Sequence, residues 1–202
     1  MDPAAMSEAS EPTWDIAYLF PLQGTWSEED YFCLPCGRLV EYVHGYLEVL
    51  PAMTELHDNI VEYLHRQLLA YVENRSIGRV LVAPIPIRLE PGKYREPDLV
   101  FMCVEHAHRR HDQFWEAPDL VMEVVSRDDR RHDLETKRRE YAWAGISEYW
   151  TIDPEDRQVV VLKLEENRYV VHGSYQQGLA SSLWLTGFSV DVDALWESAN
   201  SK

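Results

Sequence analysis

The sequence has 202 residues, of which 46% are hydrophobic, and its 35 Asp and Glu outnumber its 19 Lys and Arg. This content suits one well-cored domain rather than two. We find no apolar stretch of about 18 residues and no basic segment before an apolar one near the N-terminus, so we expect no membrane contact, no secretory signal and a cytoplasmic location. The formal net charge of −16 repels polyanions on average, so a nucleic-acid partner requires a local basic patch.

The N-terminal part predicts a short helix followed by a hairpin. Ser27 precedes three acidic residues, so we expect it to cap a helix that runs to about Leu34. The segments 38–43 and 46–50 alternate between apolar and polar residues around His44-Gly45. A turn dipeptide between two alternating segments is typical of a β-hairpin.

Apolar spacing predicts two longer helices. From Thr54 onwards apolar residues recur at helical intervals, and we expect Gly78 to stop this helix. A second helix is expected near Asp129 to Ala144, because Gly145 follows as the glycine that helix C-termini favour.

Segments rich in β-branched and aromatic residues, bounded by Pro or Gly, predict the remaining strands. They are 80–83, 85–89, 96–102, 118–126, 148–153, 159–164 and 169–172. Strands with interspersed helices predict an α/β (α+β) fold with a mixed β-sheet core flanked by helices and an N-terminal β-hairpin. We expect residues 1–25 to form a partly flexible extension and residues 26–198 a single domain.

Two of these strands carry an acid among apolar residues. Asp98 lies in EPDLVFM and Glu123 in PDLVMEVVS. A buried carboxylate is unfavourable unless a cation or donor lies beside it, so two of them on adjacent strands suggest a shared divalent metal. Paired carboxylates that hold Mg²⁺ are a common nuclease arrangement. The strands therefore predict metal-dependent phosphodiester hydrolysis.

The order of these segments resembles the Uma-type endonuclease family, a branch of the PD-(D/E)xK restriction-endonuclease-like superfamily. The resemblance rests on the hairpin, the long helix, the two acidic strands and the block DLETKRREYAWAGISEYWTIDP that follows them. It covers roughly residues 26–172. It implies a restriction-endonuclease-like sheet and a hydrolase that cuts DNA.

The resemblance also implies residue roles. Asp98 and Glu123 would bind Mg²⁺ or Mn²⁺ together with the backbone carbonyl of Val124. The usual superfamily lysine stands two residues after the second acid, where this chain has Val125. The Uma-type pattern similarly places its lysine on the following helix, which transfers the catalytic role to Lys137.

Helix geometry is compatible with that transfer. Asp133, Lys137 and Tyr141 are spaced by four residues and lie along one helix face that can pack across the strand of Glu123. Asp133 is then the orienting partner of the lysine. The alternative is a solvated Asp-Lys pair that contributes a few tenths of a kcal/mol.

Two upstream residues have open interpretations. Glu41 matches the acid of the family's E-x-x-x-G hairpin, and it is either a third acid of the site or a carboxylate on a strand surface. His57 opens the long helix where the family similarly has a histidine. Its alternative is a first-turn histidine bonded to a loop carbonyl.

Basic residues concentrate after the second acidic strand. They are Arg127, Arg130, Arg131, Lys137, Arg138 and Arg139, with His106, Arg109 and Arg110 expected nearby. We expect nucleic acid, and DNA in particular, to bind there. Two other function classes stay open: a catalytically reduced binding module and a metal-dependent hydrolase of a smaller phosphate.

The three cysteines predict no disulfide framework, and Cys33 and Cys36 form a CxxC without a second pair, so we assign them no metal or redox role. His106, His108 and His111 are expected in a solvated loop, with a phosphate or adventitious metal as the alternative.

The apolar C-terminal segment predicts the oligomeric state. Residues from Leu183 to Trp196, together with open sheet edges, would leave hydrophobic surface exposed on a monomer. We therefore expect a homodimer.

Overall fold

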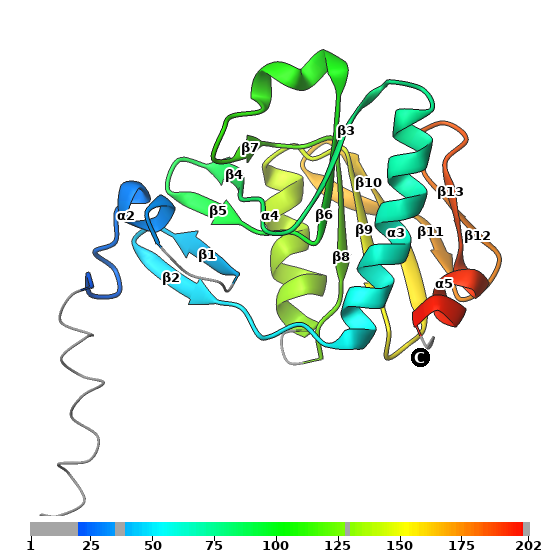
Figure 1. The fold of residues 1–202 in the computed structure, drawn as a ribbon, viewed down its shortest axis with the longest axis horizontal. Coiled ribbons are helices and arrows are strands. Elements are labelled where there is room, and N and C mark those ends of the chain that lie inside the picture. Colours follow the sequence, from blue (N-terminus) through cyan, green and yellow to red (C-terminus); the bar gives the residue numbers. More distant parts are fainter. Residues whose placement is uncertain (1–19, 35–38, 128–129, 200–202) are drawn as a thin grey trace, which may run out of the picture.

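The computed structural model describes residues 20–34, 39–127 and 130–199. Two sheets and their flanking helices make up most of this part, as Figure 1 shows. The predicted α+β class with mixed sheets flanked by helices is thus confirmed. No helix among the described residues is long and apolar enough to cross a membrane. Most of the expected extension, residues 1–19, lies outside the described part.

The predicted hairpin forms one end of a five-stranded sheet. The sheet has the order β2-β1-β5-β4-β7, with bounds β1 Val40–Val43, β2 Tyr46–Val49, β4 Ile87–Glu90, β5 Lys93–Arg95 and β7 Trp115–Glu116. The hairpin turn has positive φ at both His44 (46°) and Gly45 (91°), as a two-residue primed turn requires. Helix α2 (Glu28–Phe32) precedes it and begins with a capping box between Ser27 and Asp30.

A six-stranded sheet forms the centre of the fold. Its order is β11-β10-β9-β8-β6-β3, with bounds β3 Gly78–Val82, β6 Leu99–Cys103, β8 Leu120–Val124, β9 Glu148–Asp153, β10 Gln158–Glu165 and β11 Arg168–Tyr175. Strand β8 pairs antiparallel with β6 and parallel with β9. The acidic strands predicted from sequence are therefore neighbours at the centre of this sheet.

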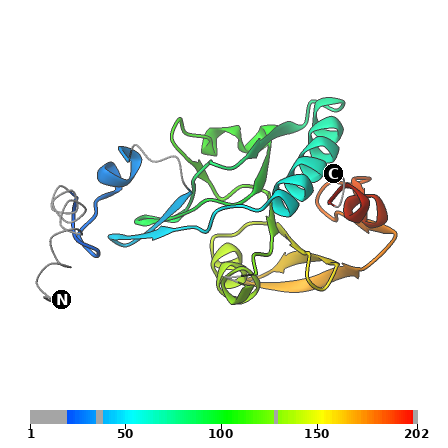
Figure 2. The ribbon, with the colours of Figure 1, turned by 60° about the horizontal axis from the view of Figure 1, so that its bottom comes forward.

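Helices cover both faces of the six-stranded sheet, and Figure 2 shows α3 (Glu55–Glu73) and α4 (Lys137–Trp143) on different sides of it. Each face of the sheet packs against its own hydrophobic core. Successive residues of a strand contribute to the two cores in turn, because their side chains point to opposite faces. Phe101 and Met122 pack in the core with α3, whereas Met102 and Val121 pack in the core with Tyr141 of α4.

Helix α3 ends earlier than predicted. Its last residue is Glu73, and Gly78 begins strand β3 instead of stopping the helix. A Cβ added to Gly78 would lie 2.3 Å from the carbonyl oxygen of Met102. The glycine therefore allows β3 and β6 to pair closely. Apolar spacing in the sequence could not distinguish a glycine needed for strand pairing from one that ends a helix.

The second predicted helix contains a π-helical segment. Residues His132–Thr136 form this segment directly before α4, and the Lys137 N–H donates to the carbonyl of His132. Gly145 follows the helix with φ 81°, which confirms its predicted place as a helix-terminating glycine. The expected start at Asp129 lies outside the described residues.

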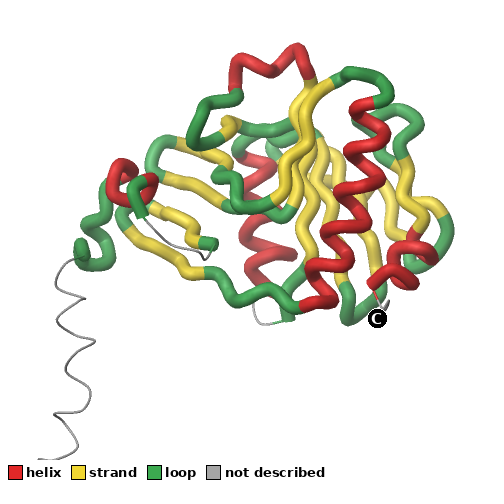
Figure 3. The backbone as a smooth tube through the Cα atoms, viewed as in Figure 1, coloured by secondary structure: helices red, strands yellow, loops and turns green. Residues whose placement is uncertain are grey.

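The C-terminal segment folds back onto the sheet, as the tube in Figure 3 shows. Strands β12 (Leu179–Ser181) and β13 (Ser189–Asp191) pair, and α5 (Val192–Ala199) packs with α3 in the larger core. None of these elements was predicted. Trp196 is 3% exposed and Leu185 4%, whereas Leu183 and Trp184 remain about half exposed. The expectation that this whole segment leaves apolar surface exposed was therefore wrong for its buried part.

Candidate active site

The pairing of β6 with β8 brings the two predicted strand acids together. Leu99 is in register with Met122, so the next residues outward, Asp98 and Glu123, lie opposite each other. Both carboxylates are buried, at 6% and 3% exposure. The parallel neighbour β9 and the helix α4 close the other sides of Glu123.

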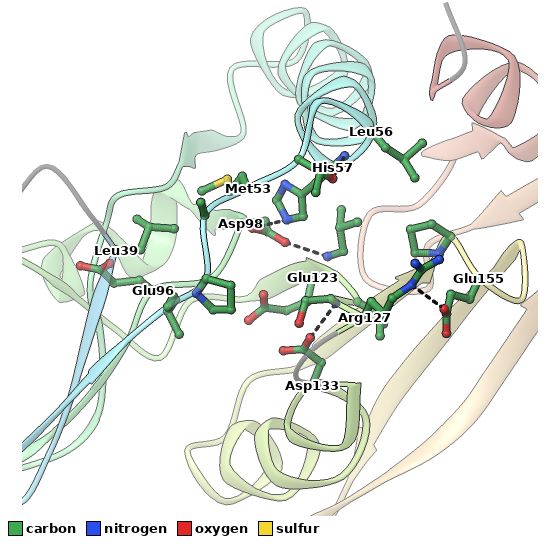
Figure 4. Close-up of a pocket in the computed structure, with 18 of the residues that line it drawn as sticks. Leu39, Met53, Leu56, His57, Glu96, Asp98, Glu123, Arg127, Asp133 and Glu155 are labelled. Atoms are coloured by element: carbon green, nitrogen blue, oxygen red, sulfur yellow. Dashed lines mark hydrogen bonds and ion pairs between the residues drawn. The ribbon is translucent and has the colours of Figure 1, made fainter. Parts of the chain in front are cut away.

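A pocket of about 610 Å³ opens at these acids. It lies between the β2–α3 connection, the first turn of α3 and the start of the helix that leads into α4, as Figure 4 shows. Polar groups gather at its base, and apolar residues line part of its mouth, including Leu39, Leu50, Pro51, Met53 and Leu56.

Asp98 is held by two hydrogen bonds. Its Oδ1 lies 3.1 Å from Nε2 of His57, and its Oδ2 accepts the N–H of Val124 at 2.7 Å. The structure therefore places His57 on the acid rather than on a loop carbonyl. Burial lowers the pKa of His57, but the hydrogen bond and charge of Asp98 outweigh burial and raise the pKa above its ordinary value.

Lys137 reaches the same pocket from the helix. Its Nζ lies 3.0 Å from Glu123 Oε1 and 3.1 Å from Asp133 Oδ1, and its side chain is 5% exposed. The solvated Asp-Lys pair was thus the wrong alternative. Burial acts to lower the pKa of Lys137, but the carboxylates of Glu123, Glu41 and Asp133 outweigh it, and the ammonium stays charged.

The pKa of Glu123 is raised, because this carboxyl group is buried next to other acids. Burial raises its pKa to about 8, Lys137 opposes that shift, and the charges of Asp98 and Asp133 add to it. The hydroxyl of Tyr141 donates to Glu123 Oε1 at 2.6 Å. The nearby cation therefore does not fully compensate the group of acids.

Glu41 is a buried acid of the same cluster. It is fully buried, its Oε2 accepts from Arg95 at 2.5 Å, and its Oε1 lies 3.9 Å from Nζ of Lys137. This excludes a surface carboxylate. Glu41 also accepts the N–H of Glu96 at 3.2 Å, so the hairpin strand is tied to the acidic segment.

Glu96 is a site residue that the sequence interpretation missed. It lines the pocket, accepts the Val40 N–H at 3.0 Å, and lies 3.3 Å from the Tyr31 hydroxyl. Burial raises its pKa to about 7. The signal was present in the sequence, because Glu96 stands two residues before Asp98 in EPD and polar residues of that segment face the same cleft.

Most cations of the predicted basic patch pair with acids or are buried, although Arg127 and Arg131 remain 81% and 87% exposed and Arg139 is exposed as well. Arg127 pairs with Glu155, Arg130 with Asp153, Glu155 and Asp156, and Arg131 with Glu135; Lys137 is buried, and Arg138 donates to the carbonyl of Tyr169. The acids that pair with Arg127 and Arg130 are 23 to 28 residues away along the chain, so sequence proximity could not indicate these pairs.

The other basic residues expected beside that patch lie elsewhere. His106 and Arg109 belong to the 3₁₀ helix η2 (Val104–Arg109), which follows the C-terminal end of β6. Asp98 stands at the other end of that strand, so His106, Arg109 and Arg110 are remote from the Arg127 segment.

Comparisons with known proteins give the family and the fold of the chain. The family Uma2, described as "Putative restriction endonuclease", matches residues 28–193. The chain belongs to the Uma2 family. A crystal structure from Anabaena variabilis, titled "a putative nuclease belonging to DUF820", aligns with TM-score 0.71 and 17% identity over 89% of this chain and 99% of that one. At this identity the alignment supports the fold alone. No curated protein matches the chain.

Proposed function

We propose that this Uma2-family chain is a divalent-metal-dependent phosphodiester hydrolase, with DNA as its substrate. One observation carries the proposal: the Lys137 ammonium from the helix lies 3.0 Å from Glu123, which stands opposite Asp98 on the neighbouring strand. Two acids and one cation at the base of an open pocket are the groups that metal-assisted phosphoryl chemistry needs.

The residues present fit a divalent cation. Carboxylates are the ligands that Mg²⁺ prefers. Burial and neighbouring acids raise the pKa of Glu123, so its charged form is unfavourable here and a cation beside it would stabilise that form. Asp98, Glu123 and the carbonyl of Val124 would hold Mg²⁺ or Mn²⁺, which supplies an activated water and neutralises phosphate charge.

The chain's own side chains have distinct parts in this proposal. Lys137 stays protonated, so it orients a water and stabilises negative charge on the phosphate rather than removing a proton. Asp133 fixes the lysine from one turn earlier, and its Oδ2 accepts the N–H of Ser126 at 3.0 Å. His57 fixes the orientation of Asp98.

Cleavage assays test the proposal directly. Single-stranded DNA, duplex DNA and RNA would be incubated with Mg²⁺, Mn²⁺ or a chelator. We expect metal-dependent DNA cleavage, and Asp98→Asn and Glu123→Gln should reduce it by more than the roughly 10–100-fold that loss of an outer-shell contact causes. Lys163→Ala and Glu165→Gln are matched controls, because both side chains are exposed on β10. Equal cleavage by Asp98→Asn and the parent would refute the proposal.

A hydrolase of a smaller phosphate is the second candidate. The ion-paired arginines around Arg127 and Arg130 offer little free positive surface to a polymer, whereas the pocket of about 610 Å³ is large enough for a single nucleotide. Activity on mononucleotides without activity on polymers would favour it. Metal binding without activity on either substrate would favour a catalytically reduced binding module.

A homodimer is the oligomeric state that we propose. The edge strand β2 exposes Tyr46 at 55% and Val49 at 59%, and the edge strand β11 exposes Val171 at 56%. Apolar edge strands are surfaces on which a second copy can pair. Light scattering should give twice 23.6 kDa, and a mass near 23.6 kDa at micromolar concentration would contradict the dimer.

A further inference from the structure

The far ends of the two acidic strands carry a second cluster of polar side chains. Cys103 ends β6, Asp119 directly precedes β8, and His106 lies in η2 above them. Nδ1 of His106 lies 2.6 Å from Oδ1 of Asp119 and 3.2 Å from Sγ of Cys103. In Figure 1, the green helical segment after β6, which is η2, lies at the opposite end of this strand from the first turn of α3. Five residues separate Asp98 from Cys103, which is roughly 16 Å at the usual rise of a strand.

The buried side chain of Asp119 anchors the cluster through a hydrogen bond to the backbone. The Asp119 side chain is 2% exposed, and its Oδ2 accepts the N–H of Cys103 at 2.7 Å across a separation of 16 residues. Its other oxygen faces His106. Asp119 is therefore fixed at the sheet end, whereas His106, with a side chain 29% exposed, belongs to the short helix and can adjust.

A cysteine nucleophile does not explain this arrangement. In a Cys-His-Asp relay the thiol and the carboxylate use different nitrogens of the imidazole, but here both contact Nδ1. Burial and Asp119 raise the pKa of the Cys103 thiol to about 11, so the free thiol is not a thiolate near neutral pH.

We propose that Cys103, His106 and Asp119 form a transition-metal site, best suited to Zn²⁺ and separate from the active-site pocket. A thiolate, an imidazole and a carboxylate are the donors that Zn²⁺ accepts, whereas Mg²⁺ takes oxygen ligands. The three ligand atoms already lie within 4.8 Å of one another. Tetrahedral ligands at zinc bond lengths are about 3.4 Å apart, so His106 has to move outward by less than about 1 Å. A water would take the fourth position.

The location implies a structural effect. The connection between Cys103 and Asp119 contains η2 and β7, and β7 pairs with β4 in the other sheet. An ion at the base of this connection would join its two ends, where β6 ends and β8 begins. It would therefore stabilise the framework of β6 and β8 without contact with the pocket at their other ends.

Metal binding by the full chain tests the site. The protein would be stripped with a chelator in a Cys33→Ser, Cys36→Ser background, which leaves Cys103 as the only thiol of the three. Zn²⁺ content after gel filtration and the thiolate charge-transfer absorption of added Co²⁺ are the measurements. We expect one Zn²⁺ per chain, a Co²⁺-thiolate band and a higher unfolding temperature with Zn²⁺.

Single substitutions then locate the ligands. Cys103→Ser, His106→Gln and Asp119→Asn should each lower Zn²⁺ affinity by at least roughly 100-fold, more than an outer-shell change. His108→Gln in the exposed part of η2 and Asp98→Asn in the pocket should leave Zn²⁺ affinity unchanged. His106 is partly exposed on a short helix, so His106→Gln should still fold. Unchanged Zn²⁺ affinity in this variant would overturn the proposal. So would loss of the Co²⁺ band in the Cys33→Ser, Cys36→Ser background.

Discussion

The ammonium of Lys137 lies 3.0 Å from Oε1 of Glu123, although the two residues belong to different elements, the helix α4 and the strand β8. Val125 occupies the strand position two residues after Glu123, is 5% exposed and lines the same pocket. A positive charge therefore lies beside Glu123, and the residue that supplies it belongs to helix α4 and not to strand β8.

Replacement of Lys137 should separate cleavage from metal binding. We expect Lys137→Met, which keeps much of the buried volume, to reduce DNA cleavage by roughly 10²–10³-fold, the usual effect of losing one charge-stabilising group. Mg²⁺ affinity should be similar or higher, because a cation next to two carboxylates has been removed. Cleavage rates and calorimetric Mg²⁺ titration measure the two effects.

A lysine returned to the strand provides the complementary experiment. In the Lys137→Met background, Val125→Lys would place an ammonium on the same strand face as Glu123, because residues i and i+2 share a face. We expect partial recovery of cleavage, with Lys163→Met as a control that leaves the parent rate unchanged. A Lys137→Met protein that cleaves at the parent rate would show that the lysine is only structural.

Loss of the imidazole at residue 57 should weaken the metal site moderately. His57 contacts Asp98 at 3.1 Å, so His57→Gln removes a side chain that orients a carboxylate. We expect a loss of roughly 10–100-fold in Mg²⁺ affinity or cleavage. His65→Gln, on the same helix α3, is the matched control. Equal losses in both variants would point to helix damage instead of a role at Asp98.

Glu96 should make the stability of the protein depend on pH. Its folded-state pKa of about 7 lies above the ordinary value of 4.5, so the native state binds the proton more tightly than the unfolded state does. The corresponding stability is complete below pH 4.5 and is lost as the pH rises through 7. Relative to Glu96→Gln, the parent should lose on the order of 1–3 kcal/mol between these pH values. Urea denaturation across this pH range measures it, and parallel curves would contradict the assignment.

The strand acids could be predicted because their sequence context is unusual. A carboxylate in EPDLVFM or PDLVMEVVS has no solvated explanation, and the structure buries both Asp98 and Glu123. Lys137 followed from the family resemblance combined with helix spacing. The alternatives for Glu41 and His57 could not be decided from sequence, because their partners Arg95 and Asp98 are 54 and 41 residues away along the chain.

The remaining features depend on long-range packing. The π-helical segment before Lys137 leaves no hydrophobic signature, and β12 and β13 have three residues each, too few to show a period. Arg127 and Arg130 were expected in a cationic patch because their acidic partners, Asp153 to Asp156, belong to a turn that is distant in sequence. Charge patterns along a chain show where cations are, and only the fold shows whether they are neutralised.

Glu148 should be essential for the docking of the C-terminal segment. It is 1% exposed, its Oε1 accepts from Trp150 Nε1 and Ser182 Oγ at 2.7 Å, and its Oε2 accepts the N–H groups of Leu183 and Trp184 at 2.8 and 2.9 Å. Glu148→Ala would leave these donors buried without an acceptor, and we expect a loss of about 3–5 kcal/mol in the free energy of unfolding. Glu148→Gln keeps one carbonyl oxygen, so its loss of stability should be smaller.

Glu165→Ala, on the exposed end of β10, is the control and should change stability by no more than about 0.5 kcal/mol. Denaturant unfolding gives these values, and limited proteolysis should show earlier cleavage after residue 176 in Glu148→Ala. A loss below 1 kcal/mol in that variant would mean that apolar contacts of Trp196 and Leu195 alone hold the segment to α3.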